Sequence, residues 1–146
     1  MALHYSLLIA GSAPRDALQA RLSAAPGYQR TSEGAAAPGL KVRISEASRL
    51  DTQITKEEFG FKPAASVVFR ADKEAEPVAL RIRLLQGCMA LLEGGTDDAV
   101  LLFNSETIVL LRRGGQVVLN QIKGFWTDEV LKVVPAPHRF ETLRNL

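Results

Sequence analysis

The fold of this chain is decided by residues 77 to 119, which read PVALRIRLLQGCMALLEGGTDDAVLLFNSETIVLLRRGGQVVL. Pro77 is favoured in the first turn of a helix, and Gly94-Gly95 is typical of a helix end. Between them, apolar residues recur at intervals of four, three, four and three: Val78, Ile82, Leu85, Met89 and Leu92. Three further apolar residues widen this stripe: Leu84, Cys88 and Leu91. We therefore expect a mostly covered helix, with three outward side chains: Arg81, Arg83 and Gln86.

Downstream of that helix, the pattern changes to short apolar runs separated by turn residues. Residues 99–103 and 107–111 are joined by Asn-Ser-Glu, and Gly114-Gly115 separates the second run from a third at 117–119. Glycine pairs supply the positive φ angles that a tight hairpin turn demands. We therefore expect three strands in an antiparallel meander.

Upstream, the sequence predicts a strand over 3–10 and then a helix that begins near Pro14 and stops at Pro26-Gly27. Val42 and Ile44 alternate with polar residues, which is typical of a half-exposed strand. Residues 66–70 are expected to form a central strand. Two segments lack clear periodicity: 31–39, expected to be a loop, and 48–63, expected to be a structured loop or short helical turn.

Near the other end of the chain, Thr127 is expected to cap a short helix that Pro135 and Pro137 break. The order of elements specifies an α+β fold, with a single sheet that contains an antiparallel C-terminal meander and is covered by helices on one face. The chain of 146 residues is expected to be one domain, 1–146, and its 47% hydrophobic content is ordinary for a globular protein.

The charge pattern does not favour nucleic acid as a partner. The formal net charge is +2, and the cations alternate with acids and apolar residues along most of the chain. Six cations could form a patch if the meander lies beside the long helix: Arg70, Lys73, Arg81, Arg83, Arg112 and Arg113. Because no aromatic residues are interleaved with them, solvated faces are the favoured interpretation.

The expected location is the cytoplasm. The apolar stretch from Tyr5 to Ala10 is short and no Lys or Arg precedes it, which disfavours a signal peptide. No run approaches the ~18 apolar residues of a membrane-spanning helix, so membrane insertion is not expected. The single cysteine, Cys88, lies in an apolar run and is interpreted as a buried structural thiol.

The sequence contains no recognisable catalytic or metal-binding motif. His4 and His138 lie at opposite ends of the chain without ligand-spaced neighbours, and neither a phosphate-binding loop nor a serine-nucleophile elbow is present. We therefore expect no metal, no cofactor and no enzymatic activity. Neighbouring carboxylates occur in four places, and they leave open a small-molecule enzyme with an acid–base pair from distant segments: 57–58, 74 and 76, 97–98, and 128–129. A regulatory adaptor module is the second alternative.

Two aromatic segments are the candidates for partner contact. Phe59 and Phe61 follow the acidic pair Glu57-Glu58, and the phenylalanines are expected to cap the core. Phe125-Trp126 follows Gly124 in a loop. Tryptophan is enriched where proteins bind proteins, but core burial with the indole N–H on a backbone carbonyl is the favoured interpretation.

Three segments carry a resemblance to a known family. They are MALHYSL at 1–7, FGF at 59–61 leading to SVVFRAD at 66–72, and DAVLLFNSETIVLLRRGG at 98–115. In these segments the chain resembles the Sit-type immunity proteins of the myxobacterial swarm-inhibition toxin exchange system.

The resemblance implies an immunity protein that binds and neutralises a cognate toxin protein exchanged between sibling cells. It supplies no catalytic residue to carry over, and it does not identify the toxin. We expect the partner contact to come from one of two segments: the acidic loop of Glu57 and Glu58 with Phe59 beside it, or the loop of Phe125 and Trp126. If the toxin is a nuclease, the acidic side chains would imitate phosphate.

Overall fold

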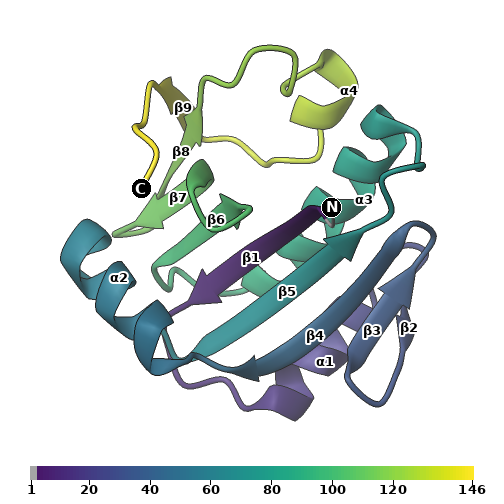
Figure 1. Cartoon of the computed structure of the whole chain (residues 1–146), viewed down its shortest axis with the longest axis horizontal. Coiled ribbons are helices and arrows are strands. Elements are labelled where there is room, and N and C mark those ends of the chain that lie inside the picture. The colour runs from purple at the N-terminus through teal and green to yellow at the C-terminus, as the bar shows by residue number, and fades with distance from the viewer. Residues whose placement is uncertain (1–2) are drawn as a thin grey trace.

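Strand β1 (Leu3–Ile9) lies at the centre of a nine-stranded sheet in the computed structural model, which describes residues 3–146. Met1 and Ala2, part of the resembling start and of the expected domain, lie outside the described residues. The strand order is β2-β3-β4-β5-β1-β6-β7-β8-β9 (Figure 1). Neighbouring strands pair antiparallel except β8 and β9, which pair parallel.

The other strands are β2 (Gln29–Arg30), β3 (Gly34–Ala37), β4 (Leu40–Glu46), β5 (Ala65–Ala71), β6 (Ala99–Phe103), β7 (Thr107–Arg113), β8 (Gln116–Asn120) and β9 (His138–Glu141). The meander of β6, β7 and β8 confirms the expected C-terminal strands. Asn104 and Ser105 have φ angles of 49° and 63°, and Gly114 and Gly115 have 57° and 80°, as tight hairpin turns require.

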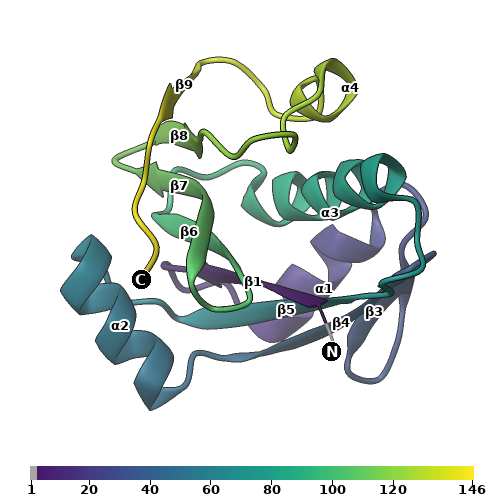
Figure 2. The same cartoon turned by 45° about the horizontal axis from the view of Figure 1, so that its top comes forward.

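Helices α1 (Arg15–Ser23) and α3 (Pro77–Leu92) lie on the same side of β4 and β5 (Figure 2). The short helix α4 (Asp128–Leu131) packs beside α3, and its Val130 joins the same hydrophobic cluster. The Thr127 side chain accepts a hydrogen bond from the Val130 amide, so the expected cap of this helix is confirmed. Together these elements confirm the α+β fold with a helix-covered sheet.

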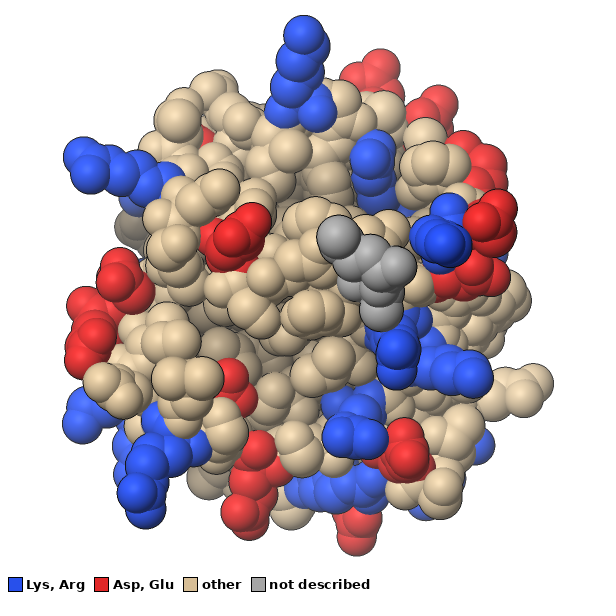
Figure 3. Space-filling view, viewed as in Figure 1, with Lys and Arg blue, Asp and Glu red and all other residues tan. Residues whose placement is uncertain are grey.

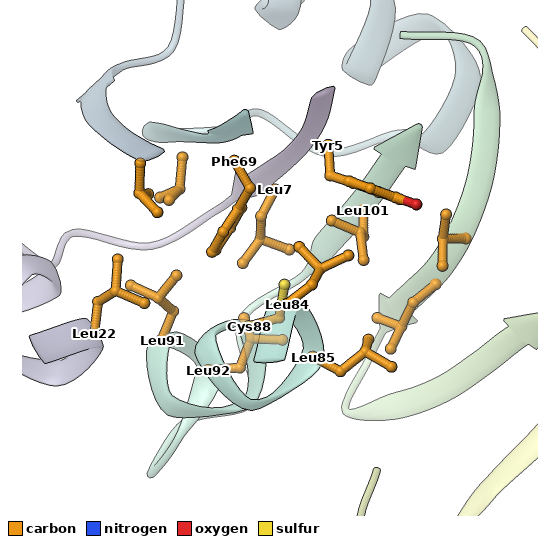
Figure 4. Packing of buried hydrophobic residues seen from close by; sticks show 14 of the residues in the cluster. Tyr5, Leu7, Leu22, Phe69, Leu84, Leu85, Cys88, Leu91, Leu92 and Leu101 are labelled. Carbon is orange, nitrogen blue, oxygen red and sulfur yellow. The ribbon is translucent and has the colours of Figure 1, made fainter. Parts of the chain in front are cut away.

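The main hydrophobic cluster lies between these helices and the sheet (Figure 4). The expected centre of the α3 stripe is wrong, because Val78, Ile82 and Met89 are only half-buried. The buried side chains of α3 share Leu85 and Leu92 with the predicted stripe but are centred one position away: Leu80, Leu84, Leu85, Cys88, Leu91 and Leu92. Apolar residues occupy most of the circumference of α3, so spacing alone could not give the rotation that packing against the sheet selects.

Residues 49–59 form a regular helix, α2 (Arg49–Phe59), where the sequence predicted a loop or short turn. The Ser48 hydroxyl accepts a hydrogen bond from the Asp51 amide at 3.0 Å, and the Asp51 carboxylate accepts one from the Ser48 amide at 3.2 Å. This capping box begins the helix. An apolar stripe is missing because α2 lies at the end of the sheet and fully buries only Thr55 and Phe59 (Figure 1).

The face of the sheet opposite α1 and α3 carries a second, smaller hydrophobic cluster. It contains Leu8, Phe59, Phe61, Val100, Leu102 and Ile108. Phe59 and Phe61 are 8% and 7% exposed, which confirms that the two phenylalanines cap the core. This end of the second face is therefore covered by the last turn of α2 and the segment after it.

Three strands occur where the sequence predicted none, and the shortest is β2, which pairs with β3. Residues 31–39 contain β3, which forms a hairpin with β4 through Pro38 and Gly39, so the expected loop is wrong. The strand was missed because alanine and glycine give no alternating apolar signal. Strand β9 was also missed, because its residues are mostly exposed and its identity depends on parallel pairing with β8. Within residues 3–146, no helix has the length and apolar character to cross a bilayer.

Candidate partner-binding surfaces

The C-terminal end of α2 presents two acids above a buried aromatic ring. Glu57 and Glu58 are exposed, whereas Phe59 is buried in the second hydrophobic cluster. The Gln53 side-chain amide donates a hydrogen bond to the Glu57 carboxylate at 3.3 Å. A partner can therefore touch the two carboxylates directly, and the buried Phe59 fixes the helix end that carries them.

Phe125 and Trp126 pack against the helix layer. Phe125 is buried, and the Trp126 ring contacts it edge-on at 4.7 Å between ring centroids. The indole N–H donates to the Asn120 carbonyl at 2.7 Å, as expected for a core position. Arg81 of α3 holds the loop, because its guanidinium lies 5.0 Å from the Phe125 ring centroid and donates to the Gly124 carbonyl at 2.9 Å.

The structure does not bring the two expected contact segments together. Phe59 belongs to the cluster on one face of the sheet, and Phe125 belongs to the main cluster on the other. The acids of α2 and the Phe125-Trp126 loop therefore belong to two separate surfaces, so a single compact partner contact would use one of them.

Sequence reasoning missed a third surface, the uncovered half of the second sheet face. We call this the open sheet face and define it by Lys41 and Arg43 of β4, Arg70 and Val68 of β5, and Ser6 of β1. Lys41 and Arg43 alternate with buried residues of β4, so they project away from the helix layer. Blue side chains gather over β4 and β5 in Figure 3, which looks at this face.

Strand register brings the cations of the open sheet face into one row. Lys41 lies directly opposite Arg70, which in turn lies directly opposite His4 of β1. Arg43 is one row away and pairs with Glu33 at 4.0 Å, with both side chains 68% exposed. The alternation of polar and apolar residues over 41–44 indicates that one face of this strand is exposed to solvent. The pairing of Lys41 with Arg70 depends on strand register, which the sequence alone does not reveal.

A hollow of about 440 Å³ adjoins this row of cations. Ala36 and Gly39 contribute small floor residues, Lys41 and Arg70 contribute positive charge, and Asp72 stands at the rim. The hollow can accept one side chain of a partner and place it between two cations.

A second hollow, of about 580 Å³, lies over the helix layer between α1, α3 and α4. Its floor contains Ile82 and Met89, the half-buried residues of α3, and its rim carries both signs of charge: Arg21, Glu93, Glu129 and Lys132. An apolar floor with a charged rim is the general form of a protein-binding surface.

Carboxylates also line a smaller hollow of about 160 Å³, where Glu93 and Asp97 lie near Arg112. This volume is below the ~300 Å³ at which small-molecule sites usually begin. Arg112 is buried and donates to the backbone carbonyls of Asp97 and Leu92 at 2.7 and 3.4 Å. Burial lowers its pKa, although Asp97 and Asp98 oppose that shift. The guanidinium therefore fastens the loop that follows α3.

The remaining side chains that could react or bind a metal have structural roles in the core. Cys88 is 1% exposed and points into the leucine cluster of α3, and burial raises the pKa of its thiol (Figure 4). Burial, with a smaller contribution from Cys88, also raises the pKa of Tyr28, whose hydroxyl donates to the Arg83 carbonyl at 2.6 Å. Among residues 3–146, no three His, Cys, Asp or Glu side chains gather as a metal site.

Comparison with known proteins agrees with the resemblance in the sequence. A family model described as SitI3-like matches residues 3–130, from the first described strand to α4. No curated protein and no solved structure matches the chain. The match covers most of the chain and includes all three candidate surfaces, so this chain belongs to the SitI3-like family of Sit-type immunity proteins.

Proposed function

We propose that this chain is an immunity protein that binds a cognate toxin and neutralises it by occupying its surface, without chemistry of its own. Membership of the SitI3-like family over residues 3–130 is the observation that carries this proposal. The proposed setting is the cytoplasm of a cell that receives the toxin from a sibling, with residues 1–146 acting as one domain.

The shape of the molecule supports a binder. Three hollows of about 440, 490 and 580 Å³ lie over the sheet face, between α3 and the strands β7 and β8, and over the helix layer. Each combines small or apolar lining residues with charged ones. A small-molecule enzyme instead needs acid and base groups that converge in a pocket large enough for substrate. The hollow that holds Glu93 and Asp97 is about 160 Å³, and Arg112 beside it is engaged with backbone carbonyls.

We propose that the acidic side chains at the C-terminal end of α2 contact the toxin directly. Glu57 and Glu58 are exposed and anchored by the buried Phe59. Phe125 and the half-buried Trp126 would act by holding their loop in shape, with the free edge of the indole as the part that a partner can reach. Neutralising a toxin requires tight binding, and the tightest protein pairs reach a Kd of about 10⁻¹³ M through a few buried anchors within complementary charge.

A protection assay tests this function. We expect a toxin gene directly upstream of this chain's gene. That gene would be expressed under an inducible promoter in a host cell, with and without this chain. We expect survival only when the chain is present, and death when an unrelated toxin of the same class replaces the cognate one. Death despite abundant folded chain would contradict the proposal, as would a metabolic operon in place of an upstream toxin gene.

The enzyme alternative makes a different prediction. If protection required turnover, one substitution of a polar residue, such as Asp97→Asn, would abolish protection without weakening toxin binding. An immunity protein that acts by binding loses protection only in parallel with affinity.

A further inference from the structure

We propose that the open sheet face is the docking surface for an acidic region of the partner protein, with a partner carboxylate seated between Lys41 and Arg70. This inference rests on the proposed toxin-binding function and extends it by naming a surface and the chemistry that surface recognises.

The first observation is the sign of the charge on this face. Within residues 3–146, the charged side chains that β1, β3, β4, β5 and β6 project from it are Lys41, Arg43 and Arg70. Glu46, the one acid in these strands, lies opposite buried Ala65 and therefore projects with the other set of side chains. Glu33 and Asp72 reach the face from its rim.

The second observation is that the two central cations are poorly placed for the stability of the isolated chain. Lys41 and Arg70 occupy directly opposite positions on β4 and β5, with His4 next in the row. Like charges in directly opposite positions destabilise a sheet. Arg43 and Arg113 form ion pairs with acids of the chain, whereas no ion pair joins Lys41 or Arg70 to an acid among residues 3–146.

The third observation is the hollow beside this pair. Its small residues, Ala36, Ala37 and Gly39, leave space of about 440 Å³ next to the two cations. Glycine is required at position 39 because φ is +80° and an added Cβ would lie 3.2 Å from the Ala75 side chain. A protruding Asp or Glu of the partner fits this combination of space and positive charge.

An acidic protein fits this face better than a nucleic acid does. A backbone footprint on duplex DNA commonly engages six to ten phosphates, and single-strand sites add stacked aromatic rings. The open sheet face offers three strand cations with Ser6 and Val68 between them, and no Phe, Tyr or Trp is among the residues that define it. This mixture of small and polar side chains around a few cations is typical of a protein interface rim.

The test compares two charge-reversed variants that change net charge equally. The first, Lys41→Glu with Arg70→Glu, alters the open sheet face. The matched control, Arg30→Glu with Arg144→Glu, alters two exposed arginines that lie outside the open sheet face and do not line the hollows described above. The probe is the catalytically disabled product of the upstream toxin gene, and association and dissociation rates are measured at low and high salt after circular dichroism has confirmed folding.

We expect the sheet variant to bind at least tenfold more weakly, mainly through slower association at low salt, and the control to bind within about twofold of the wild type. If the sheet variant binds the toxin as tightly as the wild type does, this inference is overturned and the proposed function still stands. No binding by the folded wild-type chain would overturn both. The last probe is random-sequence duplex DNA. The inference would also be overturned if the chain bound this DNA more tightly than the toxin and if that binding depended on Lys41 and Arg70.

Discussion

Lys41 of β4 and Arg70 of β5 stand directly opposite each other on the exposed face of the sheet, with an open hollow beside them. Two cations in opposite positions weaken a sheet, and here no acid of the described chain forms an ion pair with either of them. An acidic partner would relieve this repulsion on binding. The pair therefore links the stability of the free protein to the charge of the partner.

Replacement of one member of this pair should stabilise the free protein. Arg70→Glu creates opposite charges across β4 and β5, so the free energy of unfolding should rise by about 0.5 kcal/mol relative to Arg70→Gln. Urea denaturation at low salt measures the difference, which should shrink at high salt. A lower stability of Arg70→Glu than of Arg70→Gln would show that the charge of Lys41 does not favour an acid at position 70.

Charge reversal at the end of α2 should slow the encounter with the toxin. Glu57→Lys with Glu58→Lys removes two exposed carboxylates without touching buried Phe59. Association at low salt should fall by about tenfold, with stability close to that of the wild type. Stopped-flow kinetics provide the measurement, and unchanged rates at low salt would remove this helix end from the interface.

The indole N–H of Trp126 should contribute to folding. Trp126→Phe keeps an aromatic ring against Phe125 but removes the hydrogen bond to the Asn120 carbonyl. The free energy of unfolding should fall by about 1 kcal/mol, and toxin affinity should change by less than about threefold. Unchanged stability together with a large loss of affinity would instead make Trp126 a contact residue.

The capping box should be needed to hold α2 together. Ser48→Ala removes the hydroxyl that accepts from the Asp51 amide, at a cost of about 1 kcal/mol. Hydrogen exchange at Asp51 and Thr52 should accelerate, whereas Ser45→Ala on the exposed side of β4 should leave these amides unchanged. Equal protection in both variants would mean that packing of Phe59, and not the cap, holds the helix.

The buried thiol should make the fold sensitive to alkali. Burial raises the pKa of Cys88 in the folded state above its unfolded value of about 8.5. Its contribution is therefore complete below that pH and is lost as pH rises, because only the unfolded chain ionises. Between about pH 9 and 10, stability should fall by about 1.4 kcal/mol per pH unit more in the wild type than in Cys88→Ala. Parallel pH profiles would contradict this prediction.

Much of the fold follows from local sequence patterns. The meander was predictable because its apolar runs are separated by turn residues that adopt positive φ angles, such as Gly114 and Gly115. Helix α2 escaped prediction because its signal is a cap at Ser48 and Asp51 and not an apolar stripe. The rotation of α3 escaped prediction because apolar residues nearly encircle it, so only packing against the sheet distinguishes Leu84 from Ile82.

The candidate surfaces were harder to predict than the fold. Exposed acids such as Glu57 and the hydrogen bond of the Trp126 indole to a backbone carbonyl could be predicted from residue type and neighbours. The cation row could not, because Lys41 and Arg70 are far apart in the sequence and meet only through the register of β4 and β5. Register depends on the whole sheet, and a shift of one residue in either strand would move the cation of that strand to the helix-covered face.

Direct binding to the toxin is the measurement that tests the central claim most directly. The purified chain and the catalytically disabled product of the upstream toxin gene would be mixed at micromolar concentration and passed over a size-exclusion column. A surface built to hold the toxin predicts one co-eluting complex that persists on dilution to nanomolar concentration. If the folded chain and the folded toxin elute as two separate peaks, the claim that this protein acts by binding the toxin is contradicted.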